Sequence, residues 1–246
     1  MNLITRLALV VTVCSGMAPC AAISQVLIDE SFDSLPAGYQ LVPVVSANAS
    51  ASGMIGDVGG SNAIIVDAVW NVPVGGSESA AMLLDPAGAP VQLDPASRGG
   101  LFSVVWSIDA ATSGSSSLPS GFGGMFPILV IFQTQPDNSV TLSGYRLLIT
   151  PGPTQTYAFE LAAEDFDLYD GPPDFSVNGG VIRFGLLMGA TYMATTEAYT
   201  NTGRLTADNW RVSISETVFR SGFDGPPPAQ SPGNPQSMLT CPFCSR

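Results

Sequence analysis

The sequence predicts an all-β protein built as a two-sheet antiparallel β-sandwich. No convincing long helical period runs between Gln25 and Phe219. Gly, Pro, Ser, Asn and Asp instead divide this region into short apolar runs, which is typical of strands joined by turns. About ten such runs are more than one small sheet usually holds, so we expect two packed sheets.

A late run predicts the strand that closes the sandwich. Because side chains alternate along a strand, Trp210, Val212 and Ile214 share one face, while Arg211, Ser213 and Ser215 share the other. The backbone groups of such a strand need a partner, and residues 26–32 at the other end of the chain are the natural candidate. We therefore expect the two terminal strands to pair.

The remaining strands follow from the same alternation. They are expected at residues 41–46, 63–72, 80–84, 101–109, 126–132, 140–149, 156–162, 181–188 and 208–218. Phe102, Val104, Trp106 and Ile108 share one face, which predicts a core on that side. The run at 126–132 does not alternate and should be covered on both faces, with Pro127 near its start. Residues 110–124 are rich in Ser and Gly and are expected to form a loop.

Both ends of the chain differ from this middle region. Residues 1–24 have one early positive charge, an apolar run and small residues before Gln25, the order of a secretory signal peptide. Ser15, Gly16 and Pro19 interrupt the run, which disfavours a membrane anchor. We therefore expect residues 25–224 to form the sandwich of a protein that is secreted, at the cell surface or periplasmic, with no membrane span in the mature chain. Residues 225–246 form a Pro-rich tail without core-forming residues and are expected to be disordered.

Charge and missing residue types limit the function. The net charge is −12, and loss of Arg6 with the signal peptide would make it −13. This balance disfavours nucleic acid and anionic membranes as partners. The chain contains no His and no Lys. Ser-His-Asp and Cys-His catalysis, histidine metal sites, Schiff-base chemistry and the P-loop are therefore excluded, which leaves carboxylate chemistry or none.

One acidic cluster stands out. Six acids lie within the fifteen residues from Glu160 to Asp174. The cluster could be a solvated loop. It could also bind calcium, because Asp165, Asp167 and Asp170 precede Gly171 with nearly the spacing of a calcium loop. A third interpretation, a catalytic carboxylate cluster, depends on a family resemblance given below.

Aromatic residues and cysteines supply the other candidates. Sugar binding requires exposed rings beside polar groups, and Trp70, Tyr169 and Tyr199 lie in suitable polar surroundings. Trp106 and Trp210 lie on apolar faces and are expected in the core. Cys241 and Cys244 lie in the tail, where an oxidising compartment favours a disulfide within or between chains.

Short motifs resemble a known group. Residues 32–38 (FDSLPAG), residues 207–212 (ADNWRV) and the paired terminal strands resemble the jelly-roll or concanavalin-like β-sandwiches of secreted bacterial proteins, including carbohydrate-binding modules. In similar modules a structural calcium site lies at the terminal strands, which implies Glu30 and Asp208 as ligands here. Residues 218–224 (VFRSGFD) are similar to a Phe-x-x-Gly-Phe-acid ending of exported Gram-negative proteins, although this chain continues for another 22 residues.

Three functions remain open. The resemblance favours an exported, non-catalytic binding or surface-associated module with glycan as its ligand class. The first alternative is a glycoside hydrolase, because Asp165, Asp167 and Asp170 are similar in spacing to the Glu-x-Asp-x-x-Glu strand of concanavalin-like retaining enzymes. The second alternative is a structural surface protein.

Overall fold

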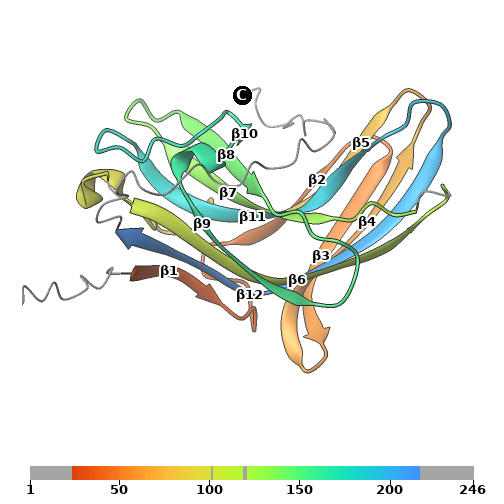
Figure 1. Cartoon of the computed structure of the whole chain (residues 1–246), viewed down its shortest axis with the longest axis horizontal. Coiled ribbons are helices and arrows are strands. Elements are labelled where there is room, and N and C mark those ends of the chain that lie inside the picture. The colour runs from red at the N-terminus through yellow and green to blue at the C-terminus, as the bar shows by residue number, and fades with distance from the viewer. Residues whose placement is uncertain (1–23, 101, 119–120, 217–246) are drawn as a thin grey trace, which may run out of the picture.

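The computed structural model describes residues 24–100, 102–118 and 121–216. This part of the chain consists of twelve strands and two short 3₁₀ helices, η1 (Pro95–Arg98) and η2 (Ala163–Asp165). All strand pairs are antiparallel, and the strands form two six-stranded sheets packed face to face (Figure 1). The predicted two-sheet sandwich of jelly-roll type is confirmed.

Sheet A contains the closing strand. Its order is β3 (Ala49–Val58), β4 (Ser61–Val72), β12 (Tyr199–Glu216), β6 (Phe102–Ser116) and β9 (Gln155–Leu161). The 18-residue β12 pairs with β4 along its first half and with β1 (Ser24–Glu30) along its second half. The predicted pairing of the terminal strands is therefore confirmed.

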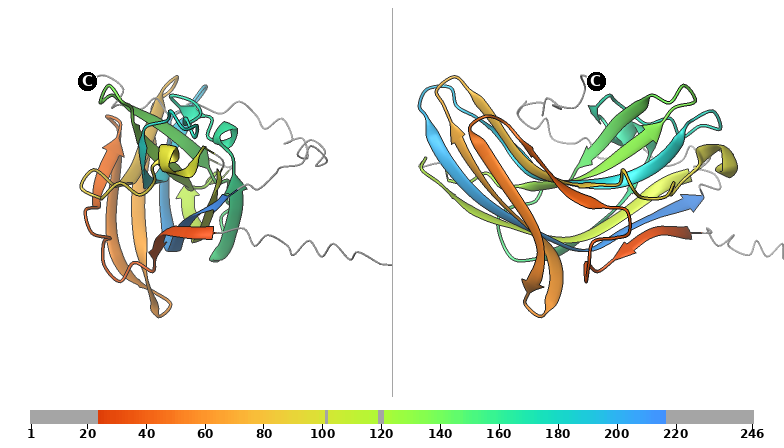
Figure 2. Two further views of the ribbon diagram at one scale, coloured as in Figure 1. Left: turned by 90° about the vertical axis from the view of Figure 1, so that its left-hand side faces the viewer. Right: turned by 180° about the vertical axis from the view of Figure 1, so that it is seen from behind.

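Sheet B covers the other side of the core. Its order is β10 (Leu168–Tyr169), β8 (Val140–Arg146), β7 (Phe126–Thr134), β11 (Val181–Met193), β5 (Ser77–Asp85) and β2 (Gln40–Val45). Figure 2, right, shows that both sheets bend in the same direction, so that sheet A lies on the convex side of the molecule.

The core occupies the space between the sheets. The predicted inward faces are confirmed, because Trp210, Val212 and Ile214 are fully buried and the alternating residues from Phe102 to Ile108 are at most 7% exposed. Phe32 stacks on the Trp210 ring at 6.3 Å, and Tyr39 meets that ring edge-on at 5.9 Å. Aromatic packing thus fixes the end of the sandwich where the terminal strands meet.

The unbroken apolar run of β7 is buried on both faces, as predicted. Residues 128–131 are each at most 1% exposed. Leu129 and Ile131 point into the main core, whereas Ile128 and Val130 belong to a second apolar cluster on the outer face of sheet B. Pro127 is the second residue of the strand, where a missing N–H removes little from the ladder.

Three features of sheet A differ from the prediction. β3 was not expected, and residues 110–116 were expected in a loop, although they continue β6 and pair with β12. Gly114 permits this continuation, because a Cβ there would lie 2.3 Å from the carbonyl oxygen of Thr202. β12 also begins at Tyr199, well before the predicted start.

Several predictions lie outside the described residues. They concern the signal peptide up to residue 23, the motif at 218–224, the Pro-rich tail and the Cys241–Cys244 disulfide. Within the described ranges, none of the helices has the length and hydropathy needed to span a membrane.

Candidate ligand-binding site

A cavity of about 560 Å³ lies where the chain crosses from β9 in sheet A to β10 in sheet B. We call it the lateral pocket. Its lining comes from β8 and the residues that follow it, from β9, from the crossing segment and from the start of β10, and consists of Tyr145, Arg146, Leu147, Leu148, Phe159, Glu164, Asp165, Asp167 and Leu168. The pocket therefore combines residues from both sheets with part of the predicted acidic cluster.

Two half-buried aromatic rings line the pocket. The rings of Tyr145 on β8 and Phe159 on β9 lie 5.8 Å apart. Both contact the fully buried Trp106, Tyr145 edge-on at 6.0 Å and Phe159 tilted at 6.4 Å. Because Trp106 is part of the core, this packing holds the two rings in place.

Charged groups surround these rings. Burial raises the pKa of the Tyr145 phenol, and the negative charges of Asp165 and Asp167 raise it further. The hydroxyl therefore stays protonated at neutral pH. The Asp165 carboxylate accepts a 2.7 Å hydrogen bond from the Ala162 N–H, which fixes the turn that carries it. Arg146 contributes the positive charge of the lining.

The structure separates the predicted calcium ligands. Asp165 and Asp167 line the lateral pocket, whereas the Asp170 carboxylate accepts a 2.8 Å hydrogen bond from the Leu142 N–H. The turn at Gly171 is present, with a φ of 96°. Within residues 24–100, 102–118 and 121–216, no three acidic, Cys or His side chains gather closely enough to hold a metal ion. Calcium binding stays a prediction.

The three acids of the catalytic interpretation lie on different elements. In the hydrolase motif the carboxylates occupy alternate positions of one strand. Here Asp165 lies in η2, Asp167 precedes β10 and Asp170 follows it. The three acids do not share a strand because the chain leaves sheet A after β9 and turns toward sheet B.

The second predicted calcium site lies at the terminal strands. Glu30 is paired with Trp210, two residues beyond Asp208 on β12. Burial raises the pKa of Glu30, and the neighbouring Asp29 raises it further. Asp208 accepts hydrogen bonds from the Ser61 hydroxyl at 2.8 Å and from the Asn209 N–H at 2.7 Å. Glu30 and Asp208 thus lie on adjacent strands, with Asp208 held by other residues.

The prediction of Trp70 as an exposed sugar platform was wrong. Its ring is fully buried, its indole N–H donates to the Ala190 carbonyl at 3.1 Å, and Tyr192 meets it edge-on at 4.9 Å. The strand end that carries it is covered by Phe122 and Tyr192. A ring enclosed in this way has no free face for a sugar.

The two predicted tyrosines lie away from the lateral pocket. Tyr199 is half-buried, and its hydroxyl donates to the Met193 carbonyl at 2.8 Å. Tyr169 has a φ of 68°, and its ring covers Gly144 on the outer face of sheet B. Ligand binding by these residues stays a prediction. Sequence reasoning missed Tyr145 and Phe159, although Phe159 directly precedes the acidic cluster at Glu160.

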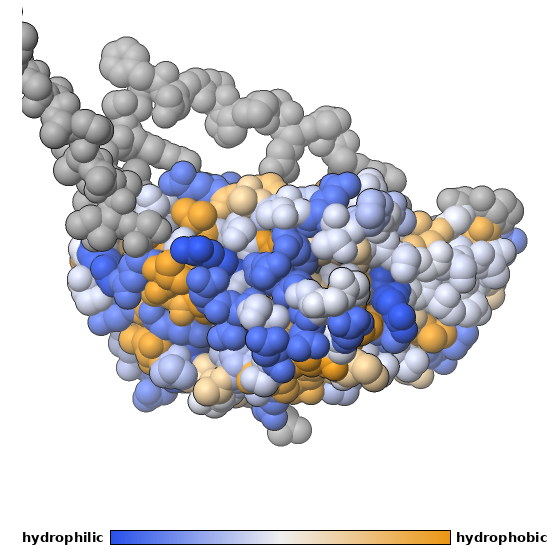
Figure 3. All heavy atoms as spheres, turned by 90° about the horizontal axis from the view of Figure 1, so that it is seen from below, coloured by the Kyte–Doolittle hydropathy of each residue, from blue (hydrophilic) through white to orange (hydrophobic). Residues whose placement is uncertain are grey.

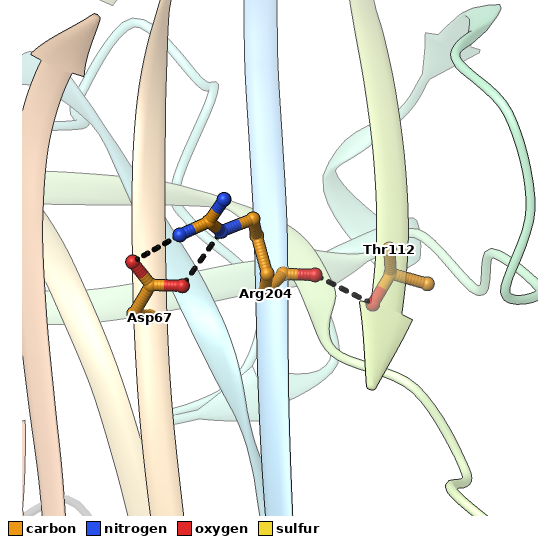
Figure 4. Close-up of polar contacts among 3 residues, drawn as sticks. All are labelled: Asp67, Thr112 and Arg204. Carbon is orange, nitrogen blue, oxygen red and sulfur yellow. Dashed lines mark hydrogen bonds and ion pairs between the residues drawn. The ribbon is translucent and has the colours of Figure 1, made fainter. Parts of the chain in front are cut away.

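A second hollow, of about 410 Å³, lies on the outer face of sheet A. We call it the outer groove. Arg204 on β12 donates two hydrogen bonds to Asp67 on β4, at 2.7 and 2.9 Å, and its carbonyl accepts a 3.3 Å bond from Thr112 on β6 (Figure 4). The other lining residues are small or aliphatic: Ser50, Ala51, Ser52, Ala68, Val69, Ser113, Gly114, Thr202 and Gly203. Figure 3 shows a largely hydrophilic surface on this side, interrupted by hydrophobic spots.

Comparison with known proteins gives matches among solved structures. No protein-family model and no curated protein matches the chain. The family 11 carbohydrate-binding module of the cellulase Lic26A-Cel5E of Clostridium thermocellum matches with 12% identity and a TM-score of 0.41, over 78% of this chain and 95% of that one. The family 11 module of Clostridium thermocellum in complex with a β-1,3-1,4-mixed-linked tetrasaccharide matches with 13% identity and a TM-score of 0.43, over 77% of this chain and 94% of that one. The CBM22-1 xylan-binding domain of Paenibacillus barcinonensis Xyn10C matches with 8% identity and a TM-score of 0.35, over 80% of this chain and 98% of that one. At such identities the similarity concerns the type of fold alone.

Proposed function

We propose that this chain is an exported, non-catalytic module that binds glycan in the lateral pocket. The observation that carries the proposal is the placement of two packed aromatic rings beside carboxylates and a guanidinium. A sugar has an apolar C–H face that packs on aromatic rings and hydroxyl groups that hydrogen-bond to charged side chains. The cavity volume lies within the range of about 300–1,000 Å³ common for small-molecule sites.

The charges of the pocket favour a neutral glycan. Glu164, Asp165 and Asp167 share the lining with one arginine, Arg146, in a chain whose net charge is −12. An acidic sugar would be repelled by these carboxylates, whereas neutral hydroxyl groups can donate hydrogen bonds to them. Neutral polysaccharides should therefore bind more tightly than uronic acid or sulfated ones.

A glycan array of neutral and acidic polysaccharides, followed by calorimetry, tests the proposal. Arg146→Ala and Asp167→Ala should each weaken binding at least tenfold, which corresponds to about 1.4 kcal/mol. Arg204→Ala in the outer groove is the control and should bind like the wild type. Absence of neutral glycan binding by a folded protein would refute the proposal, as would equal losses in Arg146→Ala and Arg204→Ala.

Hydrolysis remains the second candidate, because two of its three predicted carboxylates, Asp165 and Asp167, line the pocket. The hydrogen bond from Ala162 to Asp165 orients that carboxylate toward its own turn, which favours binding over catalysis. Release of reducing ends from a bound polysaccharide, abolished by Asp167→Asn, would establish the enzyme instead.

Export is part of the proposal and rests on the order of residues in the first 24 positions. Expression in a bacterium with a general secretion pathway, followed by mass spectrometry of the exported protein, should give a mature chain that begins at Gln25. Retention of the intact N-terminus inside the cell would contradict export.

A further inference from the structure

The edges of the two sheets differ in their protection. An edge strand presents backbone N–H and C=O groups that can pair with another strand, and natural proteins usually block them. Three of the five edges formed by the described strands carry a clear block: Pro43 in β2, only two residues in β10, and a register shift with Asp29 and Glu30 in β1. The other two edges, the seven-residue β9 and the ten-residue β3, each carry only one acid near the end of the strand. Of these two, β3 is the longer.

β3 is a regular strand without these features. It spans ten residues, contains neither Pro nor a basic residue, and has a single acid, Asp57, near its end. Its register with β4 is continuous from Ala49 to Val58. Among the described strands, none pairs with its other edge. Met54 on its outer face is 61% exposed.

The turn before β3 holds the strand in position. The buried Glu78 carboxylate on β5 accepts hydrogen bonds from the Ser46 hydroxyl, from the Asn48 N–H at 3.1 Å and from the Asn48 side-chain amide at 2.7 Å. These bonds lower the pKa of Glu78, so the carboxylate stays charged at neutral pH. The edge is therefore fixed before any partner arrives, which reduces the entropy lost on pairing.

The charge pattern of the edge allows a second copy of the chain to approach. Two copies of a chain with a net charge of −12 repel each other, but residues 49–56 are uncharged. This strip lets two copies approach with little direct repulsion between charged side chains. We propose that β3 is the interface of a two-fold dimer, in which two β3 strands pair antiparallel and join the two A sheets into one.

The sequence of β3 suits this symmetry. Paired residues of an antiparallel ladder lie on the same face, so a two-fold axis at Ser52 places Ser52 opposite itself. Met54 then lies opposite Ser50 on the outer face, and Ile55 lies opposite Ala49 on the inner face. Each large side chain thus meets a small one across the interface.

Sedimentation velocity of the full chain tests the dimer. The wild type should sediment with twice the 25.5 kDa mass of one chain. Met54→Glu should raise the dissociation constant at least tenfold, because it introduces a charge into the neutral strip. Met193→Glu is the matched control, since Met193 is 55% exposed on sheet B, and it should dimerise like the wild type. A monomeric wild type at 200 µM, or equal dissociation of both variants, would overturn the proposal.

Cysteine cross-linking tests the register. In a chain whose four cysteines are replaced by serine, Ser52→Cys should form a disulfide-linked dimer under mild oxidation. Opposite Cα atoms lie roughly 4.5–5.5 Å apart, which suits a disulfide. Ser50→Cys should cross-link far less, because it faces Met54 of the second copy. Equal cross-linking of the two variants, or none in either, would refute this interface.

Discussion

The lateral pocket and the outer groove differ in how their charged groups are satisfied. In the groove, Arg204 and Asp67 hold each other by two hydrogen bonds. In the pocket, no carboxylate of the described residues forms an ion pair with Arg146, and the Asp167 carboxylate faces the cavity without a hydrogen bond from those residues. The pocket also has aromatic rings, which the groove lining lacks.

This difference predicts that the groove charges contribute to stability and the pocket charges to ligand binding. Charged groups that pair within the chain have little left to offer a ligand, because a ligand would have to replace an existing bond. Groups that face a cavity without internal partners are available to a ligand at a smaller cost. The charges of the groove are paired, so substitutions there should lower stability and leave glycan binding unchanged. The charges of the pocket are unpaired among the described residues, so substitutions of these charges should weaken glycan binding and leave stability nearly unchanged.

The largest expected effect follows from removing the support of the pocket. Trp106 is fully buried and contacts both aromatic rings of the pocket. Trp106→Ala should lower the free energy of unfolding by about 3–5 kcal/mol, because it leaves a large cavity. It should also abolish glycan binding. Denaturant unfolding and calorimetry measure the two effects. Unchanged binding by a folded Trp106→Ala protein would show that the rings do not form the site.

Calcium should act on the pocket and not on the groove. The pocket lining carries two of the predicted ligands, Asp165 and Asp167, which a bound ion would have to draw closer together, whereas Asp67 is already neutralised by Arg204. Calcium at one hundred times its dissociation constant would add about 2.7 kcal/mol to the free energy of unfolding. Thermal unfolding in millimolar calcium and then in excess chelator measures this shift.

Two substitutions locate the calcium site. The shift should be lost in Asp167→Asn and kept in Asp208→Asn. A shift lost only in Asp208→Asn would move the site to the terminal strands, and superimposable wild-type curves would reject calcium binding.

A strand could be predicted where its pattern lies within a few consecutive residues. Trp210, Val212 and Ile214 alternate within a few residues, so the inward face of β12 could be predicted. β3 consists mainly of Ala, Ser, Gly and single larger residues, which have little strand preference of their own, and its pairing with β4 determines its structure. The Gly59–Gly60 pair between β3 and β4 was the available signal for this hairpin.

The site was harder to predict because its parts come from different sheets. The acidic cluster is continuous in sequence, so Asp165 and Asp167 could be named in advance. Tyr145 and Phe159 meet only after the two sheets pack, and no local pattern indicates that contact. Trp70 was misjudged for a related reason, because the residues that cover it, Phe122 and Tyr192, come from other parts of the chain.

Tyr39 and Tyr145 differ in the same way as the groove and the pocket, because one hydroxyl has hydrogen-bond partners within the described residues and the other has none. The Tyr39 hydroxyl donates to the Phe184 carbonyl at 2.8 Å and accepts a hydrogen bond from Gln92. The Tyr145 hydroxyl has no hydrogen-bond partner among the described residues. Tyr39→Phe should therefore lower the free energy of unfolding by about 1 kcal/mol. Tyr145→Phe should leave it nearly unchanged and should instead weaken glycan binding.

The pH dependence of stability checks the first of these tyrosines. Burial raises the pKa of Tyr39 to about 12, with a further contribution from the charge of Glu30. Because the folded state holds this proton more tightly, the stabilisation is complete below the unfolded pKa near 10 and is lost as the pH rises toward 12. Urea unfolding at pH 9 and pH 11 should show the loss in the wild type and a smaller loss in Tyr39→Phe. Equal losses would mean that Tyr39 is not the titrating group.

The smallest expected effect is that of the ion pair in the outer groove. Arg204 and Asp67 are 56% and 46% exposed, so solvent screens their attraction, although the geometry with two hydrogen bonds is favourable. A double-mutant cycle with Arg204→Ala and Asp67→Ala should give a coupling energy of about 0.2–1 kcal/mol, which falls in 1 M salt. The same cycle for Arg146 and Asp167 should give no coupling in the free protein, since no ion pair joins these residues. Coupling in the pocket as large as that in the groove would mean that the pocket charges are already paired and would remove the basis for preferring the pocket as the binding site.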